Sequence, residues 1–198
     1  MRQPLALLFA TALAACTVER DLGTTTAPAP TSTDTPREAS LVFVTQGRFT
    51  GNLAQEGGAS TGAAGADALC ALEAKQAKLE GTFVAWLATE GEDASARVGA
   101  LGPYRRVDGA TAFPGKAPVG APVVALAVTP TGETLAASDD AAVWTGTADV
   151  RRCQGFTSAR AEVSGAIGSA LATDATWTSD GRAVRPCDVR ARLYCFQR

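Results

Sequence analysis

Four cysteines constrain the fold of this 198-residue chain more than any other feature. Cys187 and Cys195 bracket a short segment near the carboxyl terminus, while Cys70 and Cys153 lie far upstream. Disulfides across those distances would tie the end of a domain back to its first helix and to its middle. Four cysteines allow three pairings, and their spacing does not choose among them. A four-cysteine zinc site is the alternative, although the chain has no C-x₂-C pair.

The first fifteen residues are typical of a secretory signal peptide. Arg2 supplies the positive start, and residues 5–15 form an apolar run that is too short to cross a bilayer as a helix. Leu13-Ala-Ala-Cys16 resembles a bacterial lipobox, in which the signal peptide is removed before a lipid-modified cysteine. The alternative is an ordinary signal peptide that happens to be followed by a cysteine. Because lipidation of Cys16 would leave an even number of cysteines, we expect an exported protein anchored by lipid to the cell membrane or outer membrane of a bacterium.

Residues 16–40 predict a lipidated amino terminus followed by a disordered tether. The segment is rich in threonine, proline, alanine and serine, and it has few apolar groups to offset the entropy of ordering. Such a tether spans roughly 25–30 Å as a flexible coil and up to about 75 Å as polyproline II. We expect residues 41–198 to form a single folded domain.

The chain has no histidine and a net charge of only −2. Without histidine there is no Ser-His-Asp or Cys-His machinery and no histidine-ligated metal. A near-neutral chain also lacks the concentrated basic surface that nucleic-acid binding needs. The glycine-rich segment 51–62 lacks the lysine of a phosphate-binding loop, and the acidic segment 90–93 lacks EF-hand spacing. We therefore expect no cofactor, no metal site and no nucleic-acid partner.

Residues 62–79 carry the clearest helical pattern. Ser60 or Thr61 is a candidate amino-terminal cap. Three leucines at helical spacing predict one buried face with Cys70 on its flank. They are Leu69, Leu72 and Leu79.

The remaining apolar runs are short and predict strands. We expect these strands at residues 41–45, 83–88, 143–147, 175–178 and 192–197. The last of them has the apolar-polar alternation of a half-buried strand. Residues 155–171 predict a loop of small residues. Proline and glycine interrupt residues 111–122, and long loops inside compact domains are often binding surfaces.

Several short segments of this domain follow one another in a recognisable order. They are Leu41-Val-Phe-Val-Thr45, Gly65-Ala-Asp-Ala-Leu-Cys70, Gly81-Thr-Phe-Val-Ala-Trp-Leu87, Val143-Trp-Thr-Gly-Thr147, Cys153-Gln-Gly-Phe-Thr-Ser158 and Leu193-Tyr-Cys-Phe196. In this order they resemble bacterial secreted domains related to the collagen NC10/endostatin domain, over about residues 41–198. The resemblance implies an α+β, C-type-lectin-like fold: a twisted, mainly antiparallel sheet with one or two packed helices and long loops. It also implies nested disulfides, Cys70–Cys195 and Cys153–Cys187.

The chain departs from the sugar-binding members of the wider superfamily. Those proteins carry Glu-Pro-Asn or Gln-Pro-Asp, and a Trp-Asn-Asp segment that ligates calcium. Neither tripeptide occurs here, and the tryptophan segment is Trp144-Thr-Gly146. Endostatin binds zinc through histidines, which this chain lacks. We therefore do not expect calcium-dependent sugar binding or zinc binding.

Arginines and tryptophans are the remaining candidates for ligand contacts. The weak candidates for an acidic-polysaccharide patch are Arg151, Arg152, Arg182 and Arg185. Solvated surface charge, offset by nearby carboxylates such as Glu162, is the interpretation that we favour. The three tryptophans lie in strand-like runs, so we expect core positions rather than sugar-stacking platforms. They are Trp86, Trp144 and Trp177.

The sequence thus predicts a non-catalytic, lipid-anchored envelope protein that presents a lectin-like domain to a macromolecular partner, either a protein or a polysaccharide. The loop at residues 111–122 and its carboxyl-half neighbours form the candidate face, and we expect a monomer. One alternative is an envelope hydrolase that uses Asp139 and Asp140. Another is a purely structural surface protein.

Overall fold

The computed structural model describes residues 38–137, 140–146, 152–178 and 183–198. Glu38–Arg198 form one compact unit. Four predicted functional residues lie outside the described residues: Cys16, Asp139, Arg151 and Arg182. The predicted signal peptide and nearly all of the predicted tether also lie outside them. Within the described ranges, no helix has the length and apolar character needed to cross a membrane.

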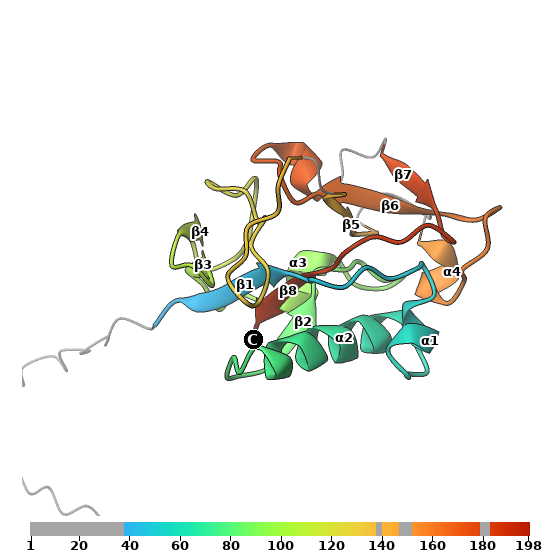
Figure 1. The fold of residues 1–198 in the computed structure, drawn as a ribbon, viewed down its shortest axis with the longest axis horizontal. Coiled ribbons are helices and arrows are strands. Elements are labelled where there is room, and N and C mark those ends of the chain that lie inside the picture. Colours follow the sequence, from blue (N-terminus) through green and yellow to red (C-terminus); the bar gives the residue numbers. More distant parts are fainter. Residues whose placement is uncertain (1–37, 138–139, 147–151, 179–182) are drawn as a thin grey trace, which may run out of the picture. The chain divides into compact units, whose positions relative to one another are not determined.

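The fold is α+β, with two sheets (Figure 1). The five-stranded sheet has the order β2-β8-β1-β3-β4. Its strands are β1 (Ser40–Val44), β2 (Phe83–Ala85), β3 (Tyr104–Arg106), β4 (Thr111–Phe113) and β8 (Tyr194–Gln197). Only the β1–β3 pairing is parallel among the pairings of this sheet in the described chain. The three-stranded sheet is antiparallel and consists of β5 (Ala142–Trp144), β6 (Ser164–Ser169) and β7 (Val184–Pro186).

The helices are short, except for one. They are α1 (Leu53–Glu56), α2 (Gly62–Gln76), α3 (Ala94–Val98), α4 (Cys153–Phe156) and the 3₁₀ helix η1 (Ala175–Trp177). The α2 helix begins as predicted, because the hydroxyl of Thr61 accepts a hydrogen bond from the backbone N–H of Ala64. It packs against β2 and β8 of the five-stranded sheet (Figure 1).

The predicted leucine face of α2 is buried only in part: Leu79, which follows the last residue of the helix, is half-buried and packs against the core. Leu69 is buried, but Leu72 is 51% exposed. Small residues fill much of the buried face, and Cys70 is fully buried where it reaches Cys195 of the neighbouring strand β8. A Cβ atom on Gly65 would come within 2.0 Å of the Leu53 carbonyl oxygen, so the backbones of α1 and α2 are in direct contact there. Close backbone contact needs small side chains, and a search for leucines at helical spacing therefore finds Leu69 but not the small residues that also face the core.

The strand β8 is buried on both faces, not half-buried as its alternation suggested. Leu193, Tyr194, Cys195 and Phe196 are all fully buried. Leu193 and Cys195 belong to the core cluster that includes the buried residues of α2. Tyr194 and Phe196 belong to a second cluster, on the opposite face, which includes Trp177. We refer to these two faces of the sheet as the α2 side and the loop side.

Both disulfides form as the resemblance implied. Cys70 pairs with Cys195 and Cys153 with Cys187, with Cα–Cα distances of 5.5 and 5.7 Å. The first closes a separation of 125 residues and the second a separation of 34. Loop-closure entropy then gives upper values of about 4–5 and 3–4 kcal/mol of stabilisation. Disulfides are typical of proteins outside the cytoplasm.

Two local predictions were wrong. Residues 164–169, predicted as part of a loop, form the strand β6, and residues 175–177, predicted as a strand, form η1. The β6 segment is glycine-rich because a Cβ atom on Gly168 would come within 2.0 Å of the Trp177 carbonyl oxygen. The η1 turn forms because the carboxylate of Asp174 accepts a hydrogen bond from the backbone N–H of Thr176.

Candidate functional site

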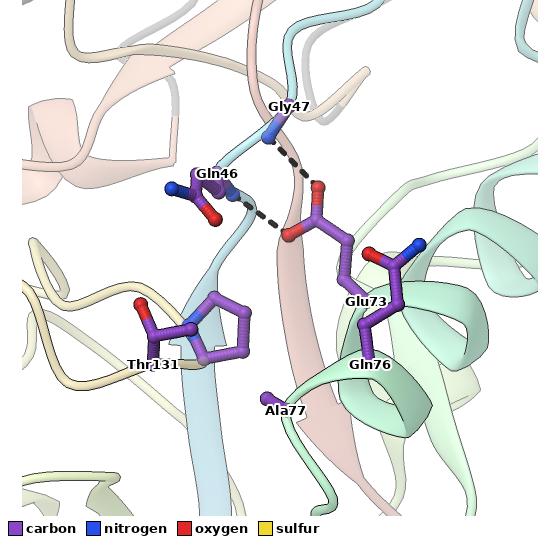
Figure 2. A pocket seen from close by; sticks show the side chains of 7 residues that line it. Gln46, Gly47, Glu73, Gln76, Ala77 and Thr131 are labelled. Atoms are coloured by element: carbon purple, nitrogen blue, oxygen red, sulfur yellow. Dashed lines mark hydrogen bonds between the residues drawn. The ribbon is translucent and has the colours of Figure 1, made fainter.

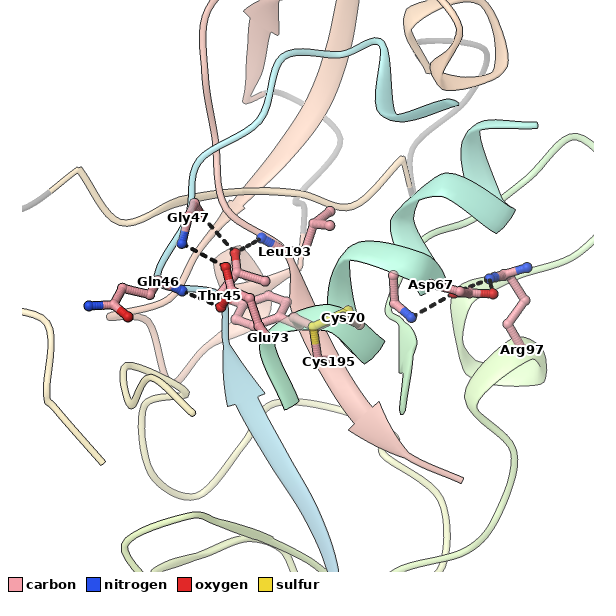
Figure 3. The surroundings of a disulfide bond; sticks show 11 residues. Thr45, Gln46, Gly47, Asp67, Cys70, Glu73, Arg97, Leu193 and Cys195 are labelled. Atoms are coloured by element: carbon pink, nitrogen blue, oxygen red, sulfur yellow. Dashed lines mark hydrogen bonds and ion pairs between the residues drawn. A yellow bond between two sulfur atoms is a disulfide. The ribbon is translucent and has the colours of Figure 1, made fainter. Parts of the chain in front are cut away.

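Three residues at three-residue spacing attach α2 to the five-stranded sheet (Figure 3). The carboxylate of Asp67 accepts the backbone N–H of Ala85 at 2.8 Å and both oxygens contact Arg97. Cys70 forms the disulfide with Cys195 one turn later. Glu73 follows after a further turn. This series was not predicted from the sequence, although its spacing of three places all three side chains on one helix face.

Glu73 fastens the segment after β1 to the helix (Figure 2). Its two carboxylate oxygens accept the backbone N–H groups of Gln46 and Gly47 at 2.7 and 2.8 Å. Burial raises the pKa of Glu73, and the two backbone hydrogen bonds and the charge of Arg192 partly counteract that rise. The guanidinium of Arg192 donates to the carbonyl oxygens of Thr45 and Gln46 at 2.7 Å, so it holds the same segment.

A polar cavity of about 330 Å³, the Glu73 pocket, lies beside this attachment (Figure 2). Its lining residues are Gln46, Gly47, Glu73, Gln76, Ala77, Pro130 and Thr131. Both oxygens of the only carboxylate in this lining already accept backbone hydrogen bonds. Those bonds hold the segment after β1 in place, so we assign Glu73 a structural role.

A more apolar cavity of about 450 Å³, the Val119 pocket, lies on the loop side. One wall is residues 118–121, from the loop that the sequence analysis identified as a candidate binding surface. That loop is shorter than predicted, because residues 111–113 form β4. The other lining residues are Trp86, Ser95, Ala175, Trp177 and Thr178. The predicted loop and a carboxyl-half segment therefore meet at one pocket.

Hydrogen bonds fix the two indole rings of this pocket. The ring N–H of Trp86 donates to the Thr178 hydroxyl at 2.7 Å, and that of Trp177 donates to the Gly120 carbonyl at 2.9 Å. The two ring centroids are 4.8 Å apart. All three tryptophans, including Trp144, are buried in the core, as predicted. Trp86 and Trp177 thus shape the pocket, but their ring faces are not open for a sugar to stack on.

Two valines of the segment that forms one wall of the Val119 pocket are exposed. Val119 is 76% exposed and Val123, four residues along the same loop, is 62% exposed. Among the described residues that line the pocket, none carries an ionisable side chain. These groups supply no acid or base for chemistry, but they suit the burial of an apolar group. A mostly apolar pocket with an exposed valine in its wall is a candidate binding site.

The two described arginines of the predicted patch contact protein acceptors. Arg152 and Arg185 pair with the same β6 residue, Gly165, from opposite sides. The guanidinium of Arg152 donates to the Gly146 carbonyl at 3.0 Å, and that of Arg185 to the Asp140 carboxylate at 2.6 Å. Carboxylates therefore offset the charges of Arg185 and of Arg160, which pairs with Glu162 at 3.3 Å, whereas Arg152 contacts a neutral carbonyl.

Asp140, a candidate in the hydrolase alternative, is an ion-pair acceptor. Its hydrogen bond with Arg185 lowers its pKa, with smaller contributions from the Ala142 backbone and from Arg48. A general acid needs the opposite shift. In the ranges that the structure describes, no three histidine, cysteine or acidic side chains gather as a metal site.

No protein-family model matches the chain, and no curated protein matches it significantly. The endostatin-like resemblance therefore rests on the order of the short segments in the sequence.

Proposed function

We propose that this protein is a lipid-anchored protein of the bacterial envelope whose C-type-lectin-like domain binds a macromolecular partner without catalysis. Three features support the lectin-like assignment. The first and last strands, β1 and β8, are paired, so the two ends of the domain lie close together. The two disulfides are nested. A long connection, residues 114–141, separates β4 from β5.

The Val119 pocket is the observation that carries the binding proposal. Its apolar lining and the exposed Val119 and Val123 favour a protein partner, because an apolar side chain gains by leaving water there. A polysaccharide would need hydrogen-bonding groups and open aromatic faces. Of the two predicted classes of partner, we therefore propose a protein, bound by a monomeric domain.

The lipid anchor would hold this domain at a membrane. Each buried methylene contributes about 0.8 kcal/mol, so two or three acyl chains on Cys16 would retain the protein almost permanently. Labelling cells with a radioactive fatty acid tests this part of the proposal. We expect label in the wild-type protein and none in Cys16→Ala. Equal labelling of both proteins, or of neither, would contradict lipidation at Cys16.

Site-specific photo-crosslinking in cells tests the binding face. With a photo-reactive residue at position 123 of the full chain, we expect discrete adducts with a partner protein. Val119→Glu should abolish these adducts, because it places a charge beside an apolar pocket. The matched control is Leu72→Glu, which makes the same change at an exposed leucine of α2. Adducts that persist in Val119→Glu, or that vanish equally in both variants, would contradict the assignment.

A further inference from the structure

The charges around the Val119 pocket indicate what kind of segment it accepts. Five described ionisable residues lie within three positions of a lining residue: Glu92, Asp93, Arg97, Lys116 and Asp174. Arg97 is already paired, because its guanidinium contacts both oxygens of Asp67 at 2.8 Å. The other four are exposed. Three carboxylates and one ammonium give this rim a net charge of −2.

The backbone keeps these charges close to the pocket. Consecutive Cα atoms are about 3.8 Å apart, so the Cα of Asp174 lies that close to the Cα of Ala175, a lining residue. Asp93 is two positions from the lining residue Ser95, and Glu92 is three, so their Cα atoms lie within about 8 and 12 Å of it. The electrostatic screening length is about 8 Å at physiological salt. The Cα atoms of Asp93 and Asp174 therefore lie within about one screening length of a lining residue, and the Cα of Glu92 lies at most about 12 Å from one.

We propose that the Val119 pocket accepts a basic peptide segment of a partner protein, with one apolar side chain inserted between residues 118–121 and 175–178. This inference rests on the proposed function and adds the chemistry of the partner. The apolar lining selects the inserted side chain, and the carboxylates of Glu92, Asp93 and Asp174 attract the flanking cations. The same rim repels acidic polysaccharides, so the charge argument also favours a protein.

Four fluorescent nonapeptides test the inserted apolar side chain and the flanking charges separately. Each peptide is titrated against the full chain by fluorescence polarisation. Each has a central leucine or serine flanked by either lysines or glutamates. We expect the lysine–leucine peptide to bind roughly tenfold more tightly than the glutamate–leucine peptide at low salt, as a few exposed charge pairs would provide. The lysine–leucine peptide should also bind more tightly than the lysine–serine peptide. The preference for lysine over glutamate peptides should vanish near about 1 M salt.

Variants without rim charges test whether those carboxylates cause the preference for lysine peptides. Glu92→Gln with Asp93→Asn should reduce the preference for lysine peptides about threefold. In the described structure the side chain of Asp93 makes no capping bond to α3, so this change spares the helix. The control is Glu80→Gln with Glu133→Gln, the same loss of two exposed carboxylates away from the pocket. It should leave the preference unchanged.

The outcomes separate the two proposals. Leucine peptides that bind equally well with either flanking charge would overturn the basic-segment inference and leave the binding pocket standing. Lysine peptides that bind equally well with leucine or serine would also overturn it, because charge alone would then explain binding. If neither leucine peptide exceeded its serine counterpart and Val119→Glu changed nothing, both proposals would fall.

Discussion

The two sides of the five-stranded sheet are built in different ways. On the α2 side, a disulfide and two carboxylates attach the helix to β8, to β2 and to the segment after β1. On the loop side, aromatic rings pack over Tyr194 and Phe196, and the 114–122 loop lies above them. Few hydrogen bonds hold that loop. Examples are the Gly102 N–H to the Lys116 carbonyl at 2.7 Å and the Trp177 ring N–H to the Gly120 carbonyl at 2.9 Å.

This difference separates stability from binding. Crosslinks and hydrogen-bonded carboxylates on the α2 side fix the framework, whereas exposed valines on the loop side contribute little to folding. Binding residues are often on loops held by a rigid scaffold. Substitutions on the α2 side should therefore change stability, and substitutions on the loop side should change binding.

Removal of the outer disulfide should have the largest effect on stability. Replacing both Cys70 and Cys195 with alanine should cost up to about 4–5 kcal/mol in the free energy of unfolding, because this bridge closes the longer loop. The Cys153/Cys187 double alanine variant should cost up to about 3–4 kcal/mol. Chemical denaturation of both variants checks the order. A larger loss from the inner bridge would contradict loop-closure entropy as the source of this order.

Loss of the Glu73 carboxylate should come next. Glu73→Ala should cost about 1–3 kcal/mol, because the Gln46 and Gly47 N–H groups lose their acceptors. The pH dependence gives a second test. Because the folded-state pKa of Glu73 is raised, its stabilising contribution is complete below the unfolded pKa and is lost as pH rises through the folded pKa. Denaturation from pH 4 upwards (about the unfolded pKa) should show wild type losing stability relative to Glu73→Gln, and a relative gain would refute this assignment.

Loss of the Asp140 carboxylate should reduce stability less than loss of Glu73, and its pH dependence should have the opposite sign. Its lowered pKa means that its contribution is present above the unfolded pKa of about 4 and is lost as pH falls through the folded pKa. Asp140→Asn should cost about 0.2–1 kcal/mol at neutral pH, because the ion pair with Arg185 is partly exposed. The difference from wild type should shrink in acid. A difference that grows in acid would show that the ion pair is not its source.

Val119→Glu should have the smallest effect on stability. The side chain is 76% exposed, so the free energy of unfolding should change by less than about 0.5 kcal/mol. The same variant should lose the partner adducts described above. Thermal unfolding of Val119→Glu, compared with that of Leu72→Glu, checks the expected small change in stability. A large loss of stability in Val119→Glu alone would mean that the loop is part of the framework.

Two kinds of information in the sequence predicted parts of the fold: the resemblance to a known family of domains, and strong local patterns. The resemblance supplied the disulfide pairing, the Thr61 cap was visible in the sequence, and the tryptophans were correctly expected in the core. The contact between α1 and α2 was not predicted, and this has a physical cause: Gly65 is buried through direct backbone contact with α1, and hydrophobic periodicity does not detect that contact.

The candidate site was predictable only as a loop. Proline and glycine marked residues 111–122, but the pocket also needs η1, which forms through the Asp174 cap and was expected to be a strand. The Glu73 attachment depends on a tertiary contact between the helix and the segment after β1. No local pattern around a solitary glutamate in a helix would have indicated it.

The most direct test of the contrast between the two sides is a photo-crosslinking scan of the full chain in cells. The photo-reactive residue is placed singly at three exposed loop-side positions and three exposed α2 positions. These positions are Val119, Ala121, Val123, Leu72, Lys75 and Gln76. We predict discrete partner adducts from the loop-side positions and none above background from α2. Adducts from α2 alone, or equally from both sides, would contradict the assignment of binding to the loop side.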